Sequence, residues 1–178
     1  MDAHWSEAAH RHFKDAGVVQ VGYVPDAGLS KLIDRCREDN EIDTVMCATE
    51  EESIGLAAGA WLGGQKAVVL MQSSGVGNTI NAIASLISSA KFPMLAIVTM
   101  RGEWGEGNPW QVPMGQAVEP TLNAVGVKTY RAETDEDADK MIEAGLRMTY
   151  SSDQPIAVLI AQRLIGSKVW KAGKGDGQ

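Results

Sequence analysis

With 178 residues, of which 44% are hydrophobic and only two are cysteines, the chain is long enough to bury a core without disulfides or a metal ion. It suits one α/β domain and is too short for two well-packed domains. Its net charge of −7 argues against nucleic acid or an anionic membrane as a partner, and we expect no signal peptide, no membrane span and a cytoplasmic location.

Apolar runs alternate with helical patterns along the chain. In chain order the pattern predicts an amphipathic N-terminal helix, a strand (18–24), a helix (29–38), a strand (42–47), a helix (50–62), a strand (67–71), a helix (76–90), a strand (94–100), a helix (114–125), a strand (127–130), a helix (135–150) and a strand (155–161). Runs such as AVVLM and MLAIVTM are apolar without alternation, which is typical of parallel strands covered on both faces. We therefore predict a doubly wound α/β fold, with a mainly parallel six-stranded sheet and helices on both faces.

One domain is expected over residues 1–168, followed by a Gly/Lys-rich tail over 169–178 that we expect to be disordered. In open parallel sheets, ligands bind at the carboxyl ends of the strands. The loops that follow the strands, at residues 25–28, 48–52, 72–78 and 101–113, are therefore the places to look for a functional site.

The helix predicted at residues 50–62 begins with the run TEEESIGLAAG. Thr49 and Glu52 fit a capping box, in which each side chain bonds the backbone N–H of the other residue, and acidic residues in a first turn interact well with the helix dipole. This accounts for Glu52 but not for the small residues that follow, which are Gly55, Ala57, Ala58 and Gly59. Small side chains at these positions would let a second backbone come close, as at a subunit interface.

The same run resembles the pyrimidine-binding (PYR) domain of thiamine diphosphate enzymes. In that family a Glu at a strand end is followed by Gly five positions later and by Ala-x-Gly at positions seven to nine; counting back from Gly55 and from Gly59 leads to Glu50. The resemblance implies that Glu50 contacts N1′ of the cofactor's aminopyrimidine, with Glu51 as the next candidate if the helix start is off by one. General acid–base catalysis by such a carboxyl group is worth about 10²–10⁴ in rate.

The loop after the strand at 67–71 reads QSSGVGN and enters a helix. A G-x-G-N turn alone is a weak signal that occurs in many phosphate-binding sheets, and this one lacks the Lys-Ser/Thr pair of a P-loop. The longer run MQSSGVGNTINAIASL resembles sulfopyruvate and phosphonopyruvate decarboxylases, in which it faces cofactor and substrate. The resemblance implies cofactor contacts from Gln72, Ser73, Gly75 and Asn78, with Gln72 also reaching the substrate. Gly75 and Gly77 are expected to serve the backbone geometry of the turn.

The first predicted strand is followed by the run PDAGL. This is a good turn sequence, with Pro25 at the second position, Asp26 at the third and Gly28 closing it. In the same decarboxylases the loop reads G-V-P-D-S-x-L and its acidic residue lies near the substrate, which implies a catalytic proton-relay role for Asp26. Ala27 stands where Ser is usual, so any role of a hydroxyl group there is lost. The turn and the relay both stay open as interpretations of Asp26.

Residues 101–113 read RGEWGEGNPWQVP, and a loop of this length inside a compact domain is usually functional or disordered. The pattern R-G-E…P-x-Q again resembles the two decarboxylases and implies that Arg101 and Gln111 bind substrate. A guanidinium group at a strand end could hold a sulfonate or phosphonate through two hydrogen bonds. The alternative for Arg101 is a salt bridge to Glu103.

A complete thiamine diphosphate enzyme also needs a PP domain, which holds Mg²⁺ and the diphosphate through a G-D-G…N-N pattern. This chain has only a Gly-Asp-Gly among its last four residues, which we interpret as coincidental. The resemblance covers nearly the whole chain and implies the alpha subunit of a split enzyme, whose beta subunit carries the PP domain and the Mg²⁺ site. The smallest working unit would be α2β2. No metal-ligand spacing occurs in this chain, so we expect it to bind no metal itself.

Three functions stay open. The first is decarboxylation of 3-sulfopyruvate to sulfoacetaldehyde and CO₂ with thiamine diphosphate as cofactor. The second is the same chemistry on phosphonopyruvate, another small 2-oxo acid, giving phosphonoacetaldehyde. The third is a non-catalytic flavodoxin-like binding or regulatory module, which would be a stable monomer indifferent to thiamine diphosphate.

Overall fold

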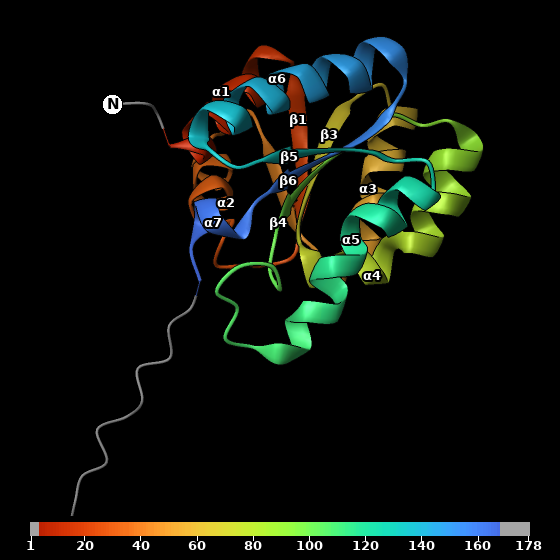
Figure 1. Ribbon diagram of the computed structural model, residues 1–178. Coiled ribbons are helices and arrows are strands. Elements are labelled where there is room, and N and C mark those ends of the chain that lie inside the picture. The colour runs from red at the N-terminus through yellow and green to blue at the C-terminus, as the bar shows by residue number, and fades with distance from the viewer. Residues whose placement is uncertain (1–3, 168–178) are drawn as a thin grey trace, which may run out of the picture.

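The computed structural model describes residues 4–167, in which six parallel strands form one sheet between two layers of helices (Figure 1). The strands are β1 (Val18–Tyr23), β2 (Asp43–Met46), β3 (Lys66–Gln72), β4 (Met94–Thr99), β5 (Lys128–Ala132) and β6 (Pro155–Ile160). The helices are α1 (Trp5–Asp15), α2 (Ser30–Glu38), α3 (Glu50–Leu62), α4 (Ser73–Ala82), the π-helical turn η1 (Ile83–Ser88), the 3-10 turn η2 (Pro109–Gln111), α5 (Val112–Ala124), α6 (Asp135–Ser152) and α7 (Gln162–Ile165). The predicted doubly wound sheet of six strands is confirmed.

The strand order β2-β1-β3-β4-β6-β5 reverses the direction of growth between β1 and β3. The chain first moves outward from β1 to β2, and then returns to the other side of β1 to build β3 and β4. In open α/β sheets, ligands bind outside the carboxyl ends of the strands at such a reversal. Because β1, β3 and β4 are parallel neighbours, the loops that follow them meet at one edge of the sheet.

Different helices cover the two faces of the sheet. α1, α2 and α6 pack on the face that carries Val68 and Leu70 of β3, whereas α3, α4, η1 and α5 pack on the face that carries Val69 and Met71. Successive side chains of a strand point to opposite faces, so β3 must be apolar at every central position to be buried on both. All six residues of β4 are buried for the same reason.

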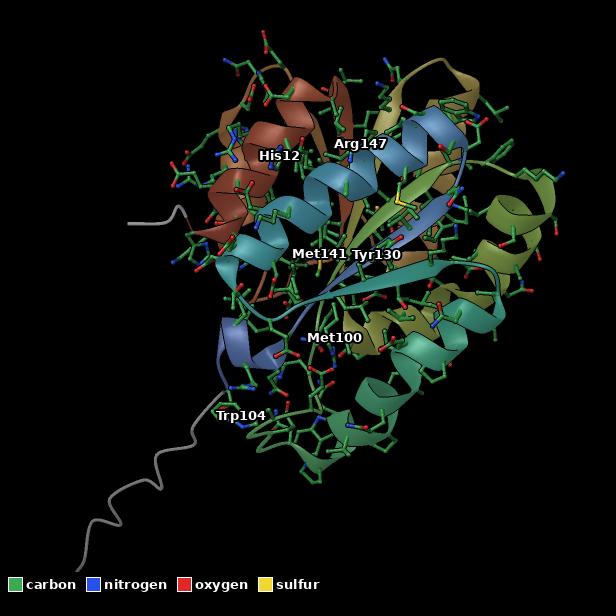
Figure 2. All side chains as sticks on the ribbon, turned by 45° about the horizontal axis from the view of Figure 1, so that its top comes forward. His12, Met100, Trp104, Tyr130, Met141 and Arg147 are labelled. Carbon is green, nitrogen blue, oxygen red and sulfur yellow. The ribbon has the colours of Figure 1, made fainter. Side chains whose placement is uncertain are left out.

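The N-terminal helix α1 is fixed by apolar packing and by a carboxylate on α6. Phe13 is fully buried, and His12 Nε2 lies 2.5 Å from Asp139 Oδ1. His12 is thus partly buried. Figure 2 shows His12 and Trp104, in the loop after β4, at opposite ends of the molecule. His12 therefore does not belong to the edge where the loops after β1, β3 and β4 meet.

The predicted capping box between Thr49 and Glu52 does not form at the start of α3. The Thr49 side chain makes no capping hydrogen bond, whereas Glu52 Oε2 accepts the backbone N–H of Ala48 at 2.6 Å. A complete capping box opens α6 instead, where Thr134 and Asp137 bond each other's backbone N–H groups. The bond to the backbone of Ala48 therefore accounts for Glu52 and leaves the first residues of α3 available for another role.

The helix predicted at residues 76–90 begins three residues earlier, at Ser73, and its second half is the π-helical turn η1. Gly75 and Gly77 consequently lie inside α4, and neither is among the glycines with positive φ. The prediction that they shape a turn was wrong, because the chain turns directly into a helix after Gln72. The need for glycine at these positions must come from the space around them.

Burial makes the Cys36 thiol unreactive. Cys36 and Cys47 are free and buried, and burial raises the pKa of Cys36 to about 12.

Within residues 4–167, no helix combines the length and apolar character needed to cross a membrane. The predicted tail over residues 169–178 lies outside the described residues.

Candidate active site

Asp26, in the loop after β1, accepts hydrogen bonds from three groups. Its Oδ1 accepts from Gln72 Nε2 at 2.6 Å, and its Oδ2 accepts from Thr99 Oγ1 at 2.8 Å and from the backbone N–H of Gly28 at 2.9 Å. Asp26 thereby joins its own loop to the ends of β3 and β4. A turn is present as well, since the Leu29 N–H donates to the Asp26 carbonyl at 3.2 Å, although it begins later than the sequence predicted. The catalytic role of Asp26 stays a prediction.

Gln72 links Asp26 to the long loop after β4. Its Oε1 accepts from Ser74 Oγ at 2.7 Å and from Gln111 Nε2 at 3.2 Å. Because Gln72 turns its Nε2 to the carboxylate of Asp26, the amide orientation of both glutamines follows from the network. Gln111 Oε1 is buried and has no hydrogen-bond partner among residues 4–167. Three residues that the sequence singled out, Asp26, Gln72 and Gln111, therefore form one polar chain.

Glu50, the first residue of α3, lies against the beginning of α4. Its Oε2 accepts a hydrogen bond from Asn78 Nδ2 at 3.0 Å, and the residue is partly buried, whereas Glu51 is exposed. A Cβ built on Gly75 would overlap the Glu50 carboxyl group and lie 2.5 Å from its Cγ. Glycine at position 75 therefore leaves the space in which the Glu50 side chain sits. The structure brings together Glu50, Gly75 and Asn78, and their contact with a cofactor stays a prediction.

Ser73 is placed differently from the other candidates. Its side chain is fully buried, and its Oγ accepts the backbone N–H of Arg101 at 3.0 Å. The hydroxyl group therefore holds the end of β4 against the start of α4. A direct contact between Ser73 and a cofactor would require this buried bond to break, and it stays a prediction.

Arg101 forms a buried ion pair with Glu106. The predicted alternative, a salt bridge to Glu103, is wrong, because Glu103 pairs with Arg131 instead. Arg101 Nε and Nη2 each lie 2.7 Å from a carboxylate oxygen of Glu106, and the two side chains are only 10% and 3% exposed. The hydrogen bonds to Glu106 raise the pKa of Arg101 above its ordinary value, although burial opposes this. The same contact lowers the pKa of Glu106 to about 2.

Asp26 and Arg101 both line a cavity of about 170 Å³. Its remaining lining comes from Ala27, Gly28, Ile165, Gly166 and Ser167. A larger hollow of about 400 Å³ lies near the amino ends of the strands, where His12, Lys66 and Arg147 contribute to its lining. Figure 2 shows His12 and Arg147 far from the loop after β4. Position relative to the sheet, rather than volume, therefore favours the smaller cavity as part of the site.

Loss of the Arg101–Glu106 pair should lower the stability of the protein by more near neutral pH than in acid. The pKa of Glu106 in the folded protein, about 2, lies below its ordinary value of 4.5, so the pair stabilises the fold fully above about pH 4.5 and progressively less as the pH falls toward 2. Thermal unfolding of the wild type and of Glu106→Gln, measured near pH 7 and near pH 3.5, should show a smaller difference in Tm at the lower pH. An equal difference at both would contradict this.

Three residues of the site were not singled out from the sequence. Thr99 stands at the carboxyl end of β4, and that position was the signal that could have found it. Glu106 carried no signal beyond its place in a long loop. Gln162 is fully buried at the start of α7, where its Oε1 accepts the backbone N–H groups of Glu103 and Trp104 at 2.9 and 3.1 Å.

Comparison with known proteins places the chain among cofactor-dependent enzymes. Residues 4–127 match the family described as "Thiamine pyrophosphate enzyme, N-terminal TPP binding domain". Sulfopyruvate decarboxylase subunit alpha of Methanocaldococcus jannaschii is 39% identical over 86% of this chain and 91% of its own length. Phosphonopyruvate decarboxylase of Streptomyces viridochromogenes is 40% identical over 51% of this chain and 23% of its own length.

A solved structure shares the fold. The 2-oxoglutarate:ferredoxin oxidoreductase of Magnetococcus marinus, with 2-oxoglutarate, coenzyme A and succinyl-CoA bound, superposes with a TM-score of 0.68 at 16% identity. The match covers 97% of this chain and 34% of that chain, so this chain spans about a third of the larger protein. At this identity the likeness concerns the arrangement of the sheet and helices alone.

Proposed function

Because the chain belongs to the thiamine pyrophosphate enzyme family, as the N-terminal TPP binding domain, we propose that it is the alpha subunit of a decarboxylase that converts 3-sulfopyruvate into sulfoacetaldehyde and CO₂. The reaction breaks the bond between the carboxylate carbon and the keto carbon and takes up one proton. The observation that carries the proposal is the position of Glu50, which Asn78 holds over Gly75. It occurs in a chain that has a relative of nearly equal length named sulfopyruvate decarboxylase subunit alpha.

The surroundings of Glu50 fit the aminopyrimidine of thiamine diphosphate. The carboxyl group is partly buried, its Oε2 is held by Asn78, and its Oε1 makes no hydrogen bond within residues 4–167. A carboxyl group oriented through one oxygen can hold or release a proton at a ring nitrogen through the other. When bound, thiamine diphosphate supplies the electron sink that accepts the electron pair left by departing CO₂.

We assign the polar chain of Asp26, Gln72 and Gln111 to the substrate. Asp26 is fixed by three donors, so its carboxylate is positioned to exchange a proton with a bound molecule. The amides of Gln72 and Gln111 provide donors and acceptors suited to a keto acid. Arg101 was also expected to bind substrate. Two of its five N–H groups bond Glu106, so any contact with substrate would use the others.

The exposed surface of α3 and η1 is evidence for a partner subunit. Gly55 and Gly59 of α3 are exposed with open space where a Cβ would be, and Leu62 of α3 and Leu86 of η1 are 73% and 43% exposed. We assign this surface to a beta subunit that carries the PP domain, with Mg²⁺ and the diphosphate site, in an α2β2 or larger assembly. A cytoplasmic location remains our expectation from the two free cysteines.

Reconstitution tests the function directly. A tagged chain is purified from its native cells, a co-purifying chain with the G-D-G…N-N pattern is identified, and CO₂ release is measured from sulfopyruvate and phosphonopyruvate. We expect activity only with both chains, thiamine diphosphate and Mg²⁺, and a higher kcat/KM for sulfopyruvate. A preference for phosphonopyruvate would move the assignment to the second decarboxylase. If the chain is a monomer that does not respond to thiamine diphosphate, the non-catalytic binding or regulatory module is the function that remains.

A further inference from the structure

The loop between β4 and α5 is closed at its neck by two glycines. Gly102 has a φ of 76°, and a Cβ there would overlap the carbonyl group of Gln111; a Cβ on Gly115 would overlap the carbonyl group of Arg101. Gln116 Nε2 also donates to the Gly102 carbonyl at 3.1 Å. The two ends of the loop therefore touch, as in compact Ω-loops whose interiors are filled by their own side chains.

Glu106 fills the interior of this loop. Its carboxylate oxygens accept hydrogen bonds of 2.7–3.1 Å from Arg101 Nε and Nη2, from the backbone N–H groups of Gly102 and Asn108, and from Gln162 Nε2. A carboxylate that is only 3% exposed is tolerated because these donors replace water. Removal of its charge would therefore loosen the loop from inside.

Gln162 fastens the same loop to α7. Besides its bond to Glu106, it accepts the backbone N–H groups of Glu103 and Trp104. Figure 2 shows Trp104 close to α7, at the end of the molecule where the loop projects. Since Gln162 is fully buried, water does not compete for its hydrogen bonds, and the position of the loop depends on the groups that join it to Gln162.

The charge of Arg101 is already balanced on this chain. Glu106 occupies the edge of the guanidinium formed by Nε and Nη2, and Asp26, the other charged residue that lines the 170 Å³ cavity, is a second acid. These three side chains sum to one negative charge (+1 −1 −1). A sulfonate placed in the cavity would meet a net negative field, which opposes binding. The pair is thus better suited to fixing the loop than to attracting an anion.

We propose that Arg101 and Glu106 act together as positioning residues, which hold the loop so that Gln111 meets Gln72 and, through it, Asp26. This rests on the proposed function, because it concerns the substrate site assigned above. The bond from Gln111 Nε2 to Gln72 Oε1 is 3.2 Å, at the long end of the normal range, so a small displacement of the loop breaks it. The direct substrate contact that the resemblance implied for Arg101 is the alternative that the following experiment separates from this role.

A double-mutant cycle in the reconstituted enzyme tests the proposal. Arg101→Met, Glu106→Gln and the double variant are assayed with sulfopyruvate and with pyruvate, which lacks the sulfonate and serves as substrate or competitive inhibitor. We expect each single variant to lose about 10- to 100-fold in kcat for misplacement of the site. The preference for sulfopyruvate over pyruvate, taken from KM or from the inhibition constant, should stay within about threefold of the wild-type preference. The kcat of the double variant should be no lower than that of the poorer single variant.

A different pattern would overturn the proposal. If Arg101→Met raises KM for sulfopyruvate alone, and the double variant does the same, Arg101 is an anion ligand. Arg131→Met is the matched control, because it removes the other Arg–Glu pair of this loop, and an equal loss of kcat there would also overturn the proposal. The double variant buries no unpaired charge, so it carries the test if a single variant fails to assemble. If the wild type does not use sulfopyruvate, the proposed function fails. The double-mutant cycle is then measured with the 2-oxo acid that the enzyme does use.

Discussion

Replacement of Glu50 by Gln is expected to lower kcat of the assembled enzyme by at least about 100-fold, which is the lower part of the range for general acid–base catalysis. Glutamine has nearly the same shape, so it can occupy the space over Gly75 and still accept a hydrogen bond from Asn78. It cannot exchange a proton as a carboxyl group does. The fold and assembly should therefore be retained while decarboxylation is lost, as measured by steady-state CO₂ release with saturating thiamine diphosphate.

Glu51→Gln is the matched control for this experiment. Glu51 follows directly in the first turn of α3 and is exposed, so its substitution should change kcat by less than about twofold to threefold, which is below the acid–base range. A large loss in Glu51→Gln with normal activity in Glu50→Gln would move the role to the neighbouring residue. Normal decarboxylation and cofactor activation in both variants would remove the assignment of a catalytic carboxyl group at this helix.

The second large effect is expected at Gly75, where alanine should cost about 100-fold in kcat without loss of stability. The added Cβ would overlap the Glu50 carboxyl group and push it away, and a misplacement of about 1 Å can cost 10²-fold in rate. The backbone of Gly75 is helical, so alanine itself is favourable there by up to about 1 kcal/mol. Thermal unfolding should therefore show an equal or higher Tm beside the loss of turnover.

Gly77→Ala separates this effect from a general disturbance of α4. Gly77 lies two residues further along the same helix, and a Cβ there would meet the Sδ of Met114 at 3.1 Å, where a flexible side chain can move aside. It should keep most of the activity. If Gly75→Ala is as active as the wild type, the position of the Glu50 side chain over α4 is not the one that catalysis uses.

Local patterns in the sequence were sufficient to predict the sheet and the edge at which the candidate residues gather. The strands predicted at 67–71 and 94–100 showed no alternation because each is buried on both faces. The loops that contain Asp26 and Gln72 could be chosen because the carboxyl ends of parallel strands meet at one edge, and the resemblance then singled out the two side chains. Glu50 needed more than periodicity, since only the resemblance to a family distinguished it from two neighbouring acids in the same turn.

The partners of these side chains were decided by the tertiary structure. Thr99 reaches Asp26 across 73 residues, and Gln162 reaches Glu106 across 56. Arg101 bonds Glu106 rather than Glu103 because the loop closes on itself and turns the nearer acid toward Arg131. Gly75 looked like a turn residue and instead makes room for Glu50. Hydrophobic periodicity reports which face of an element is buried, but contacts between loops depend on strand register and loop closure, which no local pattern encodes.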